Sequence, residues 1–355
     1  MTHTDTILVC SLEESSGKTA IALALARHAR EFGEDVGYMK PKGTRLRSVV
    51  GKVIDEDPDL ARTVLGLDAE METLEPVIYS PTFVQSALAG QVDADAVRRS
   101  VVDSFETLAA EHDRMLLEGG GRVERGSIVG LADDDVAELL DARVLLVARF
   151  DSVYDVDAVV SVARRFGDRL DGVIFNAVPE THLATLDADG VGFLASIDVP
   201  VLGVIPRVEE LSGVSVETLA DEIGAEMLVT EGRNNLVERF SVGAMGADSA
   251  LRHFRRVRNA AVVTGGDRAE IQRAAIEASG TACLILTGGH TPSGSILGAA
   301  ARHDVPVLSV RADTLTAVER AEAVLNAGRT RDEKTIDRMT SLLVDHVDLD
   351  RIFDR

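Results

Sequence analysis

The sequence has no tryptophan, three tyrosines and two cysteines in 355 residues. Cys10 and Cys283 both lie in apolar runs, so they form neither a disulfide framework nor a metal-binding spacing. No apolar run is long enough to cross a membrane, and the first residues lack the pattern of a signal peptide. These absences predict a cytoplasmic protein with no membrane partner.

Positive charge is also scarce. The chain has 59 Asp and Glu against 37 Lys and Arg, which gives a formal net charge of −22. Such a polyanion repels nucleic acid and anionic membranes, so it excludes non-specific binding to either. Only five residues are lysines. Many acids with few lysines are typical of a halophilic protein, because concentrated salt screens the self-repulsion. A merely acidic protein from a low-salt cell would explain the charge but not the missing lysines.

The chain does contain a regular alternation of short apolar runs and amphipathic segments. Helices are expected between the runs, for example at residues 19–32 and 154–166. Runs that are apolar on both faces predict a parallel α/β sheet with helices on both sides and a crevice at the carboxyl ends of its strands. The expected strands are residues 6–11, 35–39, 114–117, 143–148, 172–178 and 200–205.

A second alternation follows after about residue 231. Its expected strands are residues 260–263, 282–286 and 305–310, and its expected helices are residues 268–279, 296–302, 314–326 and 333–346. We therefore predict two domains. The first spans residues 1–231, and a smaller α/β domain with a C-terminal helix spans residues 232–355.

The segment between the first strand and the first helix has the composition of a phosphate-binding loop. Gly17 allows close approach to a phosphate, Lys18 can reach the β- and γ-phosphates, and the Thr19 hydroxyl can bind Mg²⁺. The amides at the start of the helix favour an anion. Leu12 stands where the usual pattern has its first glycine. The predicted nucleotide-binding residues of this loop are Ser11, Glu14, Ser15, Ser16, Gly17, Lys18 and Thr19.

The distribution of lysine supports this interpretation over a chance Gly-Lys-Thr in an ordinary turn. Three of the five lysines, Lys18, Lys40 and Lys42, come just after the end of a predicted strand. Arginine could serve on a solvated surface, whereas a compact ammonium group suits a phosphate site. These lysines are therefore expected to mark the site.

With Lys18 and with Lys40-Pro41 after the second strand, the first domain resembles dethiobiotin synthetase and its P-loop relatives over residues 5–228. The resemblance implies ATP and Mg²⁺ as cofactors, with Lys18 and Lys40 as catalytic residues. It also implies that Glu118, which opens Glu-Gly-Gly-Gly, binds Mg²⁺ together with Thr19 and an acid at Asp55 or Asp57. Asn176 and Pro206 would line the adenine pocket. In so acidic a chain, an acidic pair near residue 55 has close to an even chance of occurring without any function. Asn176 could simply cap a turn, and Pro206 could simply end a strand.

The second domain resembles a DRTGG domain, because two of its strands end in the same Thr-Gly-Gly tripeptide and Asp-Arg follows the first. The two domains together are similar to the N-terminal, regulatory half of long phosphotransacetylases, without their acetyltransferase domain. A turn followed by a helix can bind an anion, although Asp267 could equally be an ordinary N-cap. The candidate ligand residues are Thr264, Gly265, Gly266, Asp267, Arg268, Thr287, Gly288 and Gly289.

Two functions follow from these motifs. The first is a regulatory protein that binds ATP·Mg²⁺ and senses a small anionic ligand or an acetate-metabolism enzyme. The second is an ATP-dependent ligase of the dethiobiotin synthetase type that acts on an unknown carboxylate or amine. An amidotransferase is disfavoured, because Cys283 lies inside an apolar strand. The resemblance also implies a homodimer or a higher homo-oligomer.

Overall fold

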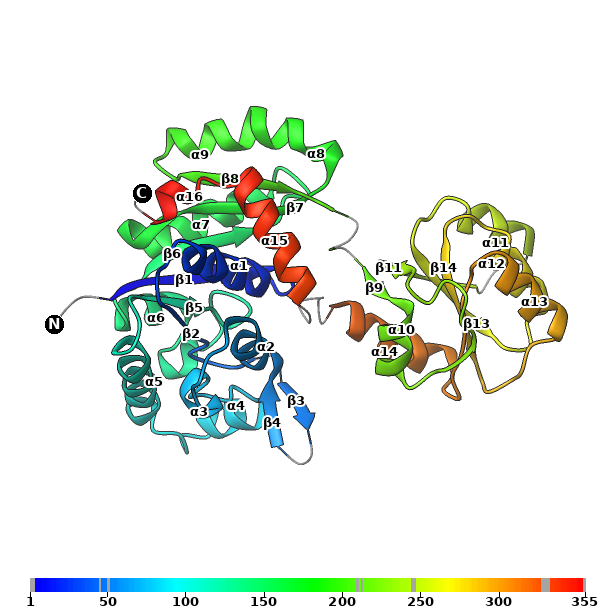
Figure 1. The fold of residues 1–355 in the computed structure, drawn as a ribbon, viewed down its shortest axis with the longest axis horizontal. Coiled ribbons are helices and arrows are strands. Elements are labelled where there is room, and N and C mark those ends of the chain that lie inside the picture. The colour runs from blue at the N-terminus through cyan, green and yellow to red at the C-terminus, as the bar shows by residue number, and fades with distance from the viewer. Residues whose placement is uncertain are drawn as a thin grey trace. The chain divides into compact units, whose positions relative to one another are not determined.

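The computed structural model describes residues 4–44, 46–49, 52–208, 211, 213–243, 247–326 and 333–353. The chain forms two compact units, and the first contains both ends of the chain (Figure 1). Unit 1 is Met1–Arg207 with Thr330–Arg355, and unit 2 is Val208–Arg329.

The strands of unit 1 form a six-stranded parallel sheet in the order β2-β5-β1-β6-β7-β8 among its described residues. This confirms the predicted parallel α/β sheet. β1 lies in the middle, and its residues Ile7, Leu8, Val9 and Cys10 are fully buried. The strands are β1 (Asp5–Ser11), β2 (Val36–Met39), β5 (Arg114–Glu118), β6 (Arg143–Ala148), β7 (Leu170–Val178) and β8 (Val201–Pro206), and an antiparallel hairpin joins β3 (Leu46–Val49) to β4 (Lys52–Asp55).

Helices cover both faces of this sheet. α1 contacts β1, β2 and β5, while α5 and α7 pack on β2, β5 and β7. Right-handed crossovers place α1 on one face and α5 and α7 on the other. The helices are α1 (Lys18–Glu31), α2 (Glu56–Leu65), α3 (Met71–Leu74), α4 (Pro81–Leu88), α5 (Ala94–Ala109), α6 (Asp133–Leu139), α7 (Asp155–Phe166), α8 (Glu180–Thr185), α9 (Gly192–Ser196), α15 (Glu333–His346) and α16 (Leu349–Phe353).

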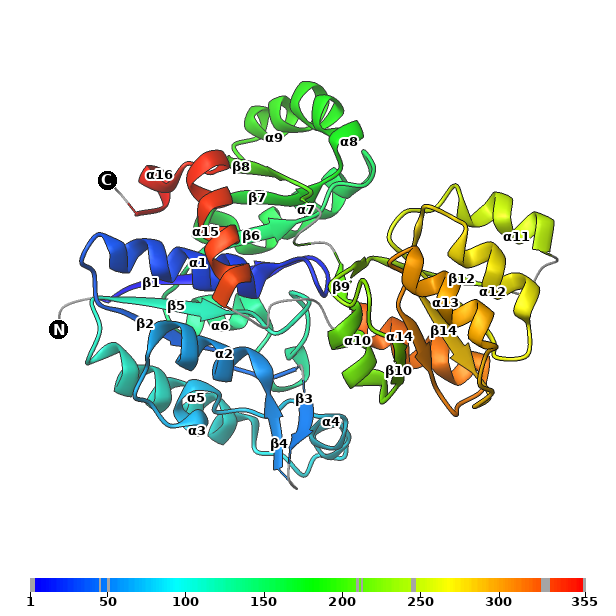
Figure 2. The ribbon, with the colours of Figure 1, turned by 45° about the vertical axis from the view of Figure 1, so that its right-hand side comes forward.

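The C-terminal helices return to unit 1 after the chain has completed unit 2. α15 packs against α1, as Figure 2 shows, and Arg27 of α1 pairs with Asp337 of α15 at 2.7 Å. The amide of Asp348 donates to the carbonyl of Leu202 in β8 at 2.8 Å. Unit 2 is therefore an insertion between β8 and α15, whereas the sequence predicted the last helix in the second domain.

Unit 2 has its own sheet, in the order β10-β15-β14-β13-β12 among its described residues. The last four strands run parallel, and β10 is antiparallel to β15. Because β10 belongs to this sheet, the unit begins well before the predicted boundary at residue 231. Its elements are β9 (Val214–Ser215), α10 (Val216–Ile223), β10 (Glu226–Val229), β11 (Leu236–Val237), β12 (Arg239–Val242), α11 (Ala247–Phe254), β13 (Ala260–Gly265), α12 (Ala269–Ile276), β14 (Thr281–Thr287), α13 (Gly294–Arg302), β15 (Val307–Ser309) and α14 (Thr314–Asn326).

Candidate functional site

The loop between β1 and α1 is held in a tight conformation that requires glycine. Gly17 caps α1 in the left-handed region with φ 90°, and the amide Nδ2 of Asn176 donates to the carbonyl of Ser16 at 2.8 Å. A Cβ on Gly17 would lie 2.3 Å from that Nδ2 atom. Asn176 on β7 therefore supports the loop through this hydrogen bond, a contact that the sequence did not predict.

The loop is also fixed at its start and on its outer side. Ser11 donates from Oγ to the carbonyl of Gly121 at 2.9 Å. Arg149 donates to the carbonyl of Ser15, which has φ 57°, and Glu14 forms an ion pair with Arg125 at 2.5 Å. Neither arginine belonged to the predicted site, because each reaches the loop from a segment distant in sequence.

Ser16 is the loop residue whose polar group has no partner. Its Oγ atom is buried and makes no hydrogen bond to any described residue. Buried hydroxyl groups nearly always form a hydrogen bond, either within the protein or to a water or another bound group. The Ser16 hydroxyl is therefore available to a group bound in the loop.

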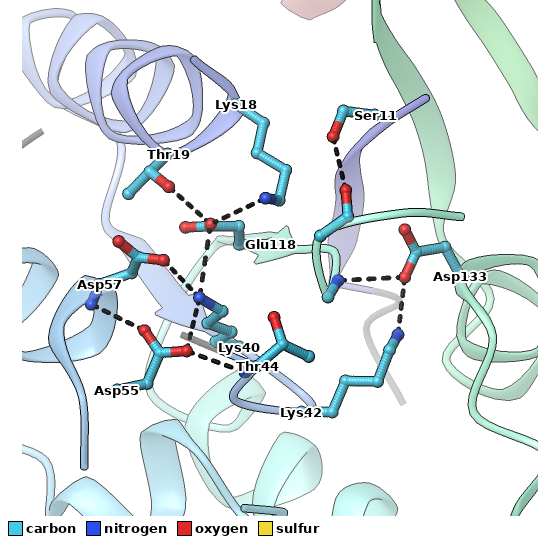
Figure 3. Close-up of polar contacts among 12 residues, drawn as sticks. Ser11, Lys18, Thr19, Lys40, Lys42, Thr44, Asp55, Asp57, Glu118 and Asp133 are labelled. Atoms are coloured by element: carbon cyan, nitrogen blue, oxygen red, sulfur yellow. Dashed lines mark hydrogen bonds and ion pairs between the residues drawn. The ribbon is translucent and has the colours of Figure 1, made fainter. Parts of the chain in front are cut away.

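Glu118, at the end of β5, is the centre of the site (Figure 3). The Thr19 hydroxyl donates to its Oε1 atom and the Tyr38 hydroxyl to its Oε2 atom, both at 2.7 Å. The ammonium groups of Lys18 and Lys40 lie 3.8 and 3.7 Å from Oε1. Burial raises the pKa of Glu118, and these two lysines oppose that rise. The structure thus brings together four of the predicted residues and adds Tyr38.

Lys40 lies among three carboxylates. Its ammonium group is 2.9 Å from Asp55, and it also pairs with Asp57 and with Glu118. Burial lowers the pKa of Lys40, but Asp57, Glu118 and Asp55 together outweigh it and raise the pKa above its usual value. The three carboxylates therefore favour the charged form of Lys40.

Both of the acids proposed as alternatives lie at the start of α2. Asp55 caps the helix by accepting from the amide of Asp57 at 3.0 Å, and it also accepts from the amide of Thr44 at 3.0 Å. Asp57 is 1% exposed and contacts Lys40. Both carboxylates therefore adjoin Lys40, so the geometry leaves open which of them would bind a metal.

The residues fit a magnesium ion bound together with a nucleotide. Among the described residues, no group of three His, Cys, Asp or Glu forms a metal site by itself. Mg²⁺, however, usually takes one or two carboxylates and completes its coordination with water and substrate phosphates. The Thr19 hydroxyl and the nearby carboxylates are hard oxygen donors of this kind. The unpartnered Ser16 hydroxyl agrees with a site that a ligand completes.

Of the three lysines expected to mark the site, Lys18 and Lys40 point to Glu118 and Lys42 does not. Lys42 extends away from Glu118 and pairs with Asp133 at 2.6 Å (Figure 3). Pro206, the last predicted residue of unit 1, ends β8 opposite Val178 of β7. It therefore lies on the strand next to the one that carries Asn176.

In unit 2 the polar groups at the Thr-Gly-Gly turns already have hydrogen-bond partners within the chain. The Gly266 amide donates to the carbonyl of Thr287 at 3.0 Å, and the Gly288 amide donates to the carbonyl of Ala312 at 3.0 Å. Arg268 donates to the carbonyl of Gly243. Asp267 does not cap α12, because the N-cap is Arg268. An anion at these turns would have to displace some of these bonds.

No helix in the described part of the chain is long and apolar enough to cross a membrane.

Comparison with known proteins places both units in families. Residues 5–215 match the family AAA_26, described as an AAA domain, and residues 218–324 match the DRTGG domain. Over 94% of its length the chain is 25% identical to a phosphate acetyltransferase of Pseudomonas aeruginosa and covers 49% of that protein. Over 62% of its length it is 26% identical to the ATP-dependent dethiobiotin synthetase of Clostridium acetobutylicum and covers 98% of it.

The chain therefore spans about half the length of the phosphate acetyltransferases that it matches. Among solved structures, the CBS and DRTGG domains of a Clostridium perfringens pyrophosphatase are 22% identical, with a TM-score of 0.29, and the match covers 50% of this chain and 71% of that one. The phosphate loop, the Glu118 site and the two family matches lead to one conclusion. The chain belongs to the AAA domain family AAA_26 of P-loop proteins and carries a DRTGG domain after the P-loop domain.

Proposed function

We propose that unit 1 binds ATP with Mg²⁺ and that the protein is regulatory, with unit 2 as its sensing domain. The observation that carries this proposal is the convergence of Lys18 and Thr19, from the start of α1, on the Glu118 carboxylate at the end of β5. A phosphate bound by the loop amides would lie next to a cation, a hydroxyl and a carboxylate, which is the chemistry that a Mg²⁺-nucleotide requires.

The predicted lysines, metal ligands and adenine-pocket residues would then act on different parts of the nucleotide. Lys18 contacts the β- and γ-phosphates, while Thr19, Glu118 and an acid at Asp55 or Asp57 hold Mg²⁺. Lys40 neutralises the negative charge of the terminal phosphate. The bound ion would spread the charge of the phosphate oxygens. Asn176 and Pro206, on neighbouring strands, border the adenine.

Calorimetric titration of the full chain with ATP·Mg²⁺ in molar KCl tests the proposal. We expect the wild type to bind and Lys18→Ala to lose most of the affinity. Lys334→Ala is the matched control, because Lys334 is an exposed lysine on α15, and this variant should bind like the wild type. Absence of binding by the wild type would overturn the proposal.

The regulatory role rests on the family of unit 2. Its ligand would be a small anion at the Thr-Gly-Gly turns and Arg268, or the unit would contact an enzyme of acetate metabolism, as the match to phosphate acetyltransferases suggests. We also propose that the protein is a homodimer or a higher homo-oligomer in the cytoplasm of a halophilic cell. Sedimentation in molar KCl, with and without ATP·Mg²⁺, would test the oligomeric state.

The second candidate function is an ATP-dependent ligase. It is favoured by the 98% coverage of a dethiobiotin synthetase and by Lys40, a buried cation that would neutralise a carboxylate or carbamate intermediate. Incubation with ATP, bicarbonate and candidate amines separates the two functions. ADP formed in proportion to a carboxylated or cyclised product supports the ligase, whereas binding without turnover supports the regulator.

A further inference from the structure

Lys42 and Asp133 form an ion pair beside the proposed nucleotide site. Lys42 was expected to mark the phosphate site, but it does not contact Glu118 as Lys18 and Lys40 do. Lys42 follows β2 and Asp133 opens α6. Their charged atoms are 2.6 Å apart, and each side chain is only 1% exposed. Figure 3 shows the pair apart from Lys18, which points to Glu118.

Asp133 forms hydrogen bonds with the turn that follows Glu118. Its Oδ1 atom accepts both from Lys42 and from the amide of Gly120, at 3.2 Å, and its own amide donates to the carbonyl of Val123 at 2.9 Å. The turn is therefore anchored within two residues of Glu118. Lys42 supplies the positive charge that allows a buried carboxylate to be the anchor.

The glycines of the turn are matched to this pair. A Cβ on Gly119 would lie 2.4 Å from Asp133 Oδ2, and a Cβ on Gly120 would lie 2.4 Å from Lys42 Cε. Neither glycine has a positive φ, so the reason for glycine at both positions is space and not backbone conformation. The two side chains thus fit directly against the backbone of the turn.

Stability alone does not account for such a pair. Apolar residues of similar volume are often as stable as a buried ion pair, because taking two charges out of water is costly. One of only five lysines is used here, and it points away from the site that Lys18 and Lys40 face. The Oδ1 atom of Asp133 accepts two hydrogen bonds and so fixes the local geometry of the turn, whereas its buried Oδ2 atom has no hydrogen-bond partner among the described residues.

We propose that Lys42 and Asp133 are positioning residues. Through the Gly119–Gly121 turn they hold the Glu118 carboxylate where it binds the Mg²⁺ of a nucleotide. This inference rests on the proposed function. It separates Lys42 from the lysines that contact phosphate: Lys18 and Lys40 act on the ligand, whereas Lys42 acts through the turn.

The first test compares the affinity for ATP with Mg²⁺ and with EDTA, in the full chain. The double variant Lys42→Met/Asp133→Leu removes both charges together, so it leaves no unpaired charge in the interior. The gain is the affinity for ATP with Mg²⁺ divided by the affinity for ATP with EDTA. We expect this gain to fall by about ten- to a hundredfold, which is the usual effect of losing a residue that supports a metal ligand. The affinity in EDTA should stay close to that of the wild type. An unchanged gain would overturn the proposal.

Two further variants complete this test. Asp133→Glu keeps the charge and moves the carboxylate by one methylene, so it should also lower the gain if the double variant fails to fold. Arg165→Met/Asp134→Leu removes an ion pair of 2.5 Å from the neighbouring position of α6, and it should leave the gain unchanged.

The second test needs no ligand. Hydrogen exchange of the peptide that contains Gly119–Gly121 should be about tenfold faster in Lys42→Met/Asp133→Leu than in the wild type, because the Gly120 amide loses its acceptor. If the wild type does not bind ATP, the proposed function fails, and exchange still decides whether the pair holds the turn. Exchange at the rate of the wild type would overturn the positioning role.

Discussion

The Nδ2 atom of Asn176 lies 2.8 Å from the carbonyl oxygen of Ser16 and occupies the space where a side chain on Gly17 would begin. The turn before α1 is therefore determined twice, by the left-handed φ of Gly17 and by a side chain from β7. These two constraints can be separated by mutation.

Gly17→Ala should destabilise unit 1 by about 1–3 kcal/mol from backbone strain alone and by more from the contact with Asn176. Gly33→Ala is the matched control, since Gly33 follows the other end of α1 with φ 86° and has no atom within 4 Å of the added Cβ. Urea unfolding measures both. Equal losses in the two variants would show that the Asn176 contact adds nothing.

Lys40→Met should be strongly destabilising, because it leaves Asp55, Asp57 and Glu118 buried without their shared cation. Removing one partner of a buried pair costs about 3–5 kcal/mol. Burial raises the pKa of Glu118 and Lys40 opposes that rise, so without Lys40 the pKa would rise further and the loss should grow as the pH rises and shrink in acid.

Thermal unfolding of Lys40→Met at several pH values between about 5 and 8 measures this loss. Lys334→Met, an exposed lysine on α15, should unfold like the wild type. A loss that is independent of pH would contradict the assigned charges.

Glu75 should make stability depend on pH. Burial first, and then Asp55, raises its pKa to about 8. Because the folded value lies above the unfolded one, the contribution of Glu75 to stability is largest in acid and is lost as the pH rises toward about 8. Glu75→Gln keeps the shape and removes this dependence, so it should raise the melting temperature at pH 8 and change it little in acid.

Glu72→Gln, an exposed change on α3, is the control for Glu75→Gln. Circular dichroism melts of both variants across this pH range make the comparison. If Glu75→Gln and Glu72→Gln behave alike, Glu75 does not titrate as described.

The net charge of −22 should make folding depend on salt. The screening length falls from about 30 Å at 0.01 M to about 3 Å at 1 M ionic strength, so KCl relieves the repulsion among the acidic side chains. We expect the melting temperature to rise steeply with KCl, and sucrose of equal osmolality to give a smaller rise. A melting temperature that is flat in KCl would exclude a halophilic protein.

Much of the fold was predictable because the information is local. Strands that are buried on both faces read as continuous apolar runs, and the Gly-Lys-Thr at a strand–helix junction marks a phosphate loop wherever the rest of the chain lies. For the same reason the Thr-Gly-Gly turns of the second unit were recognisable. The predicted parallel sheet is confirmed, and so are both family assignments.

The domain boundaries were less predictable, because they depend on which surface an element covers. The apolar face of α15 is visible in the sequence, but no local pattern indicates that it packs on α1, which ends at Glu31, whereas α15 begins only at Glu333. In the same way, β10 is a short apolar run whose partner, β15, comes about eighty residues later.

The sequence by itself determined that this is an acidic P-loop protein with a DRTGG domain, and that Lys18, Thr19, Lys40 and Glu118 are the candidate site. Lys18 and Thr19 are marked by the spacing of one strand–turn–helix, and Lys40 and Glu118 by short motifs at the ends of two other strands. Only the tertiary structure decided that Tyr38 bonds to Glu118, that Asn176 supports the loop, and that Lys42 pairs with Asp133. Those partners come from separate strands and helices. Their contact depends on how the parallel strands align at one edge of the sheet, and no local pattern encodes that alignment.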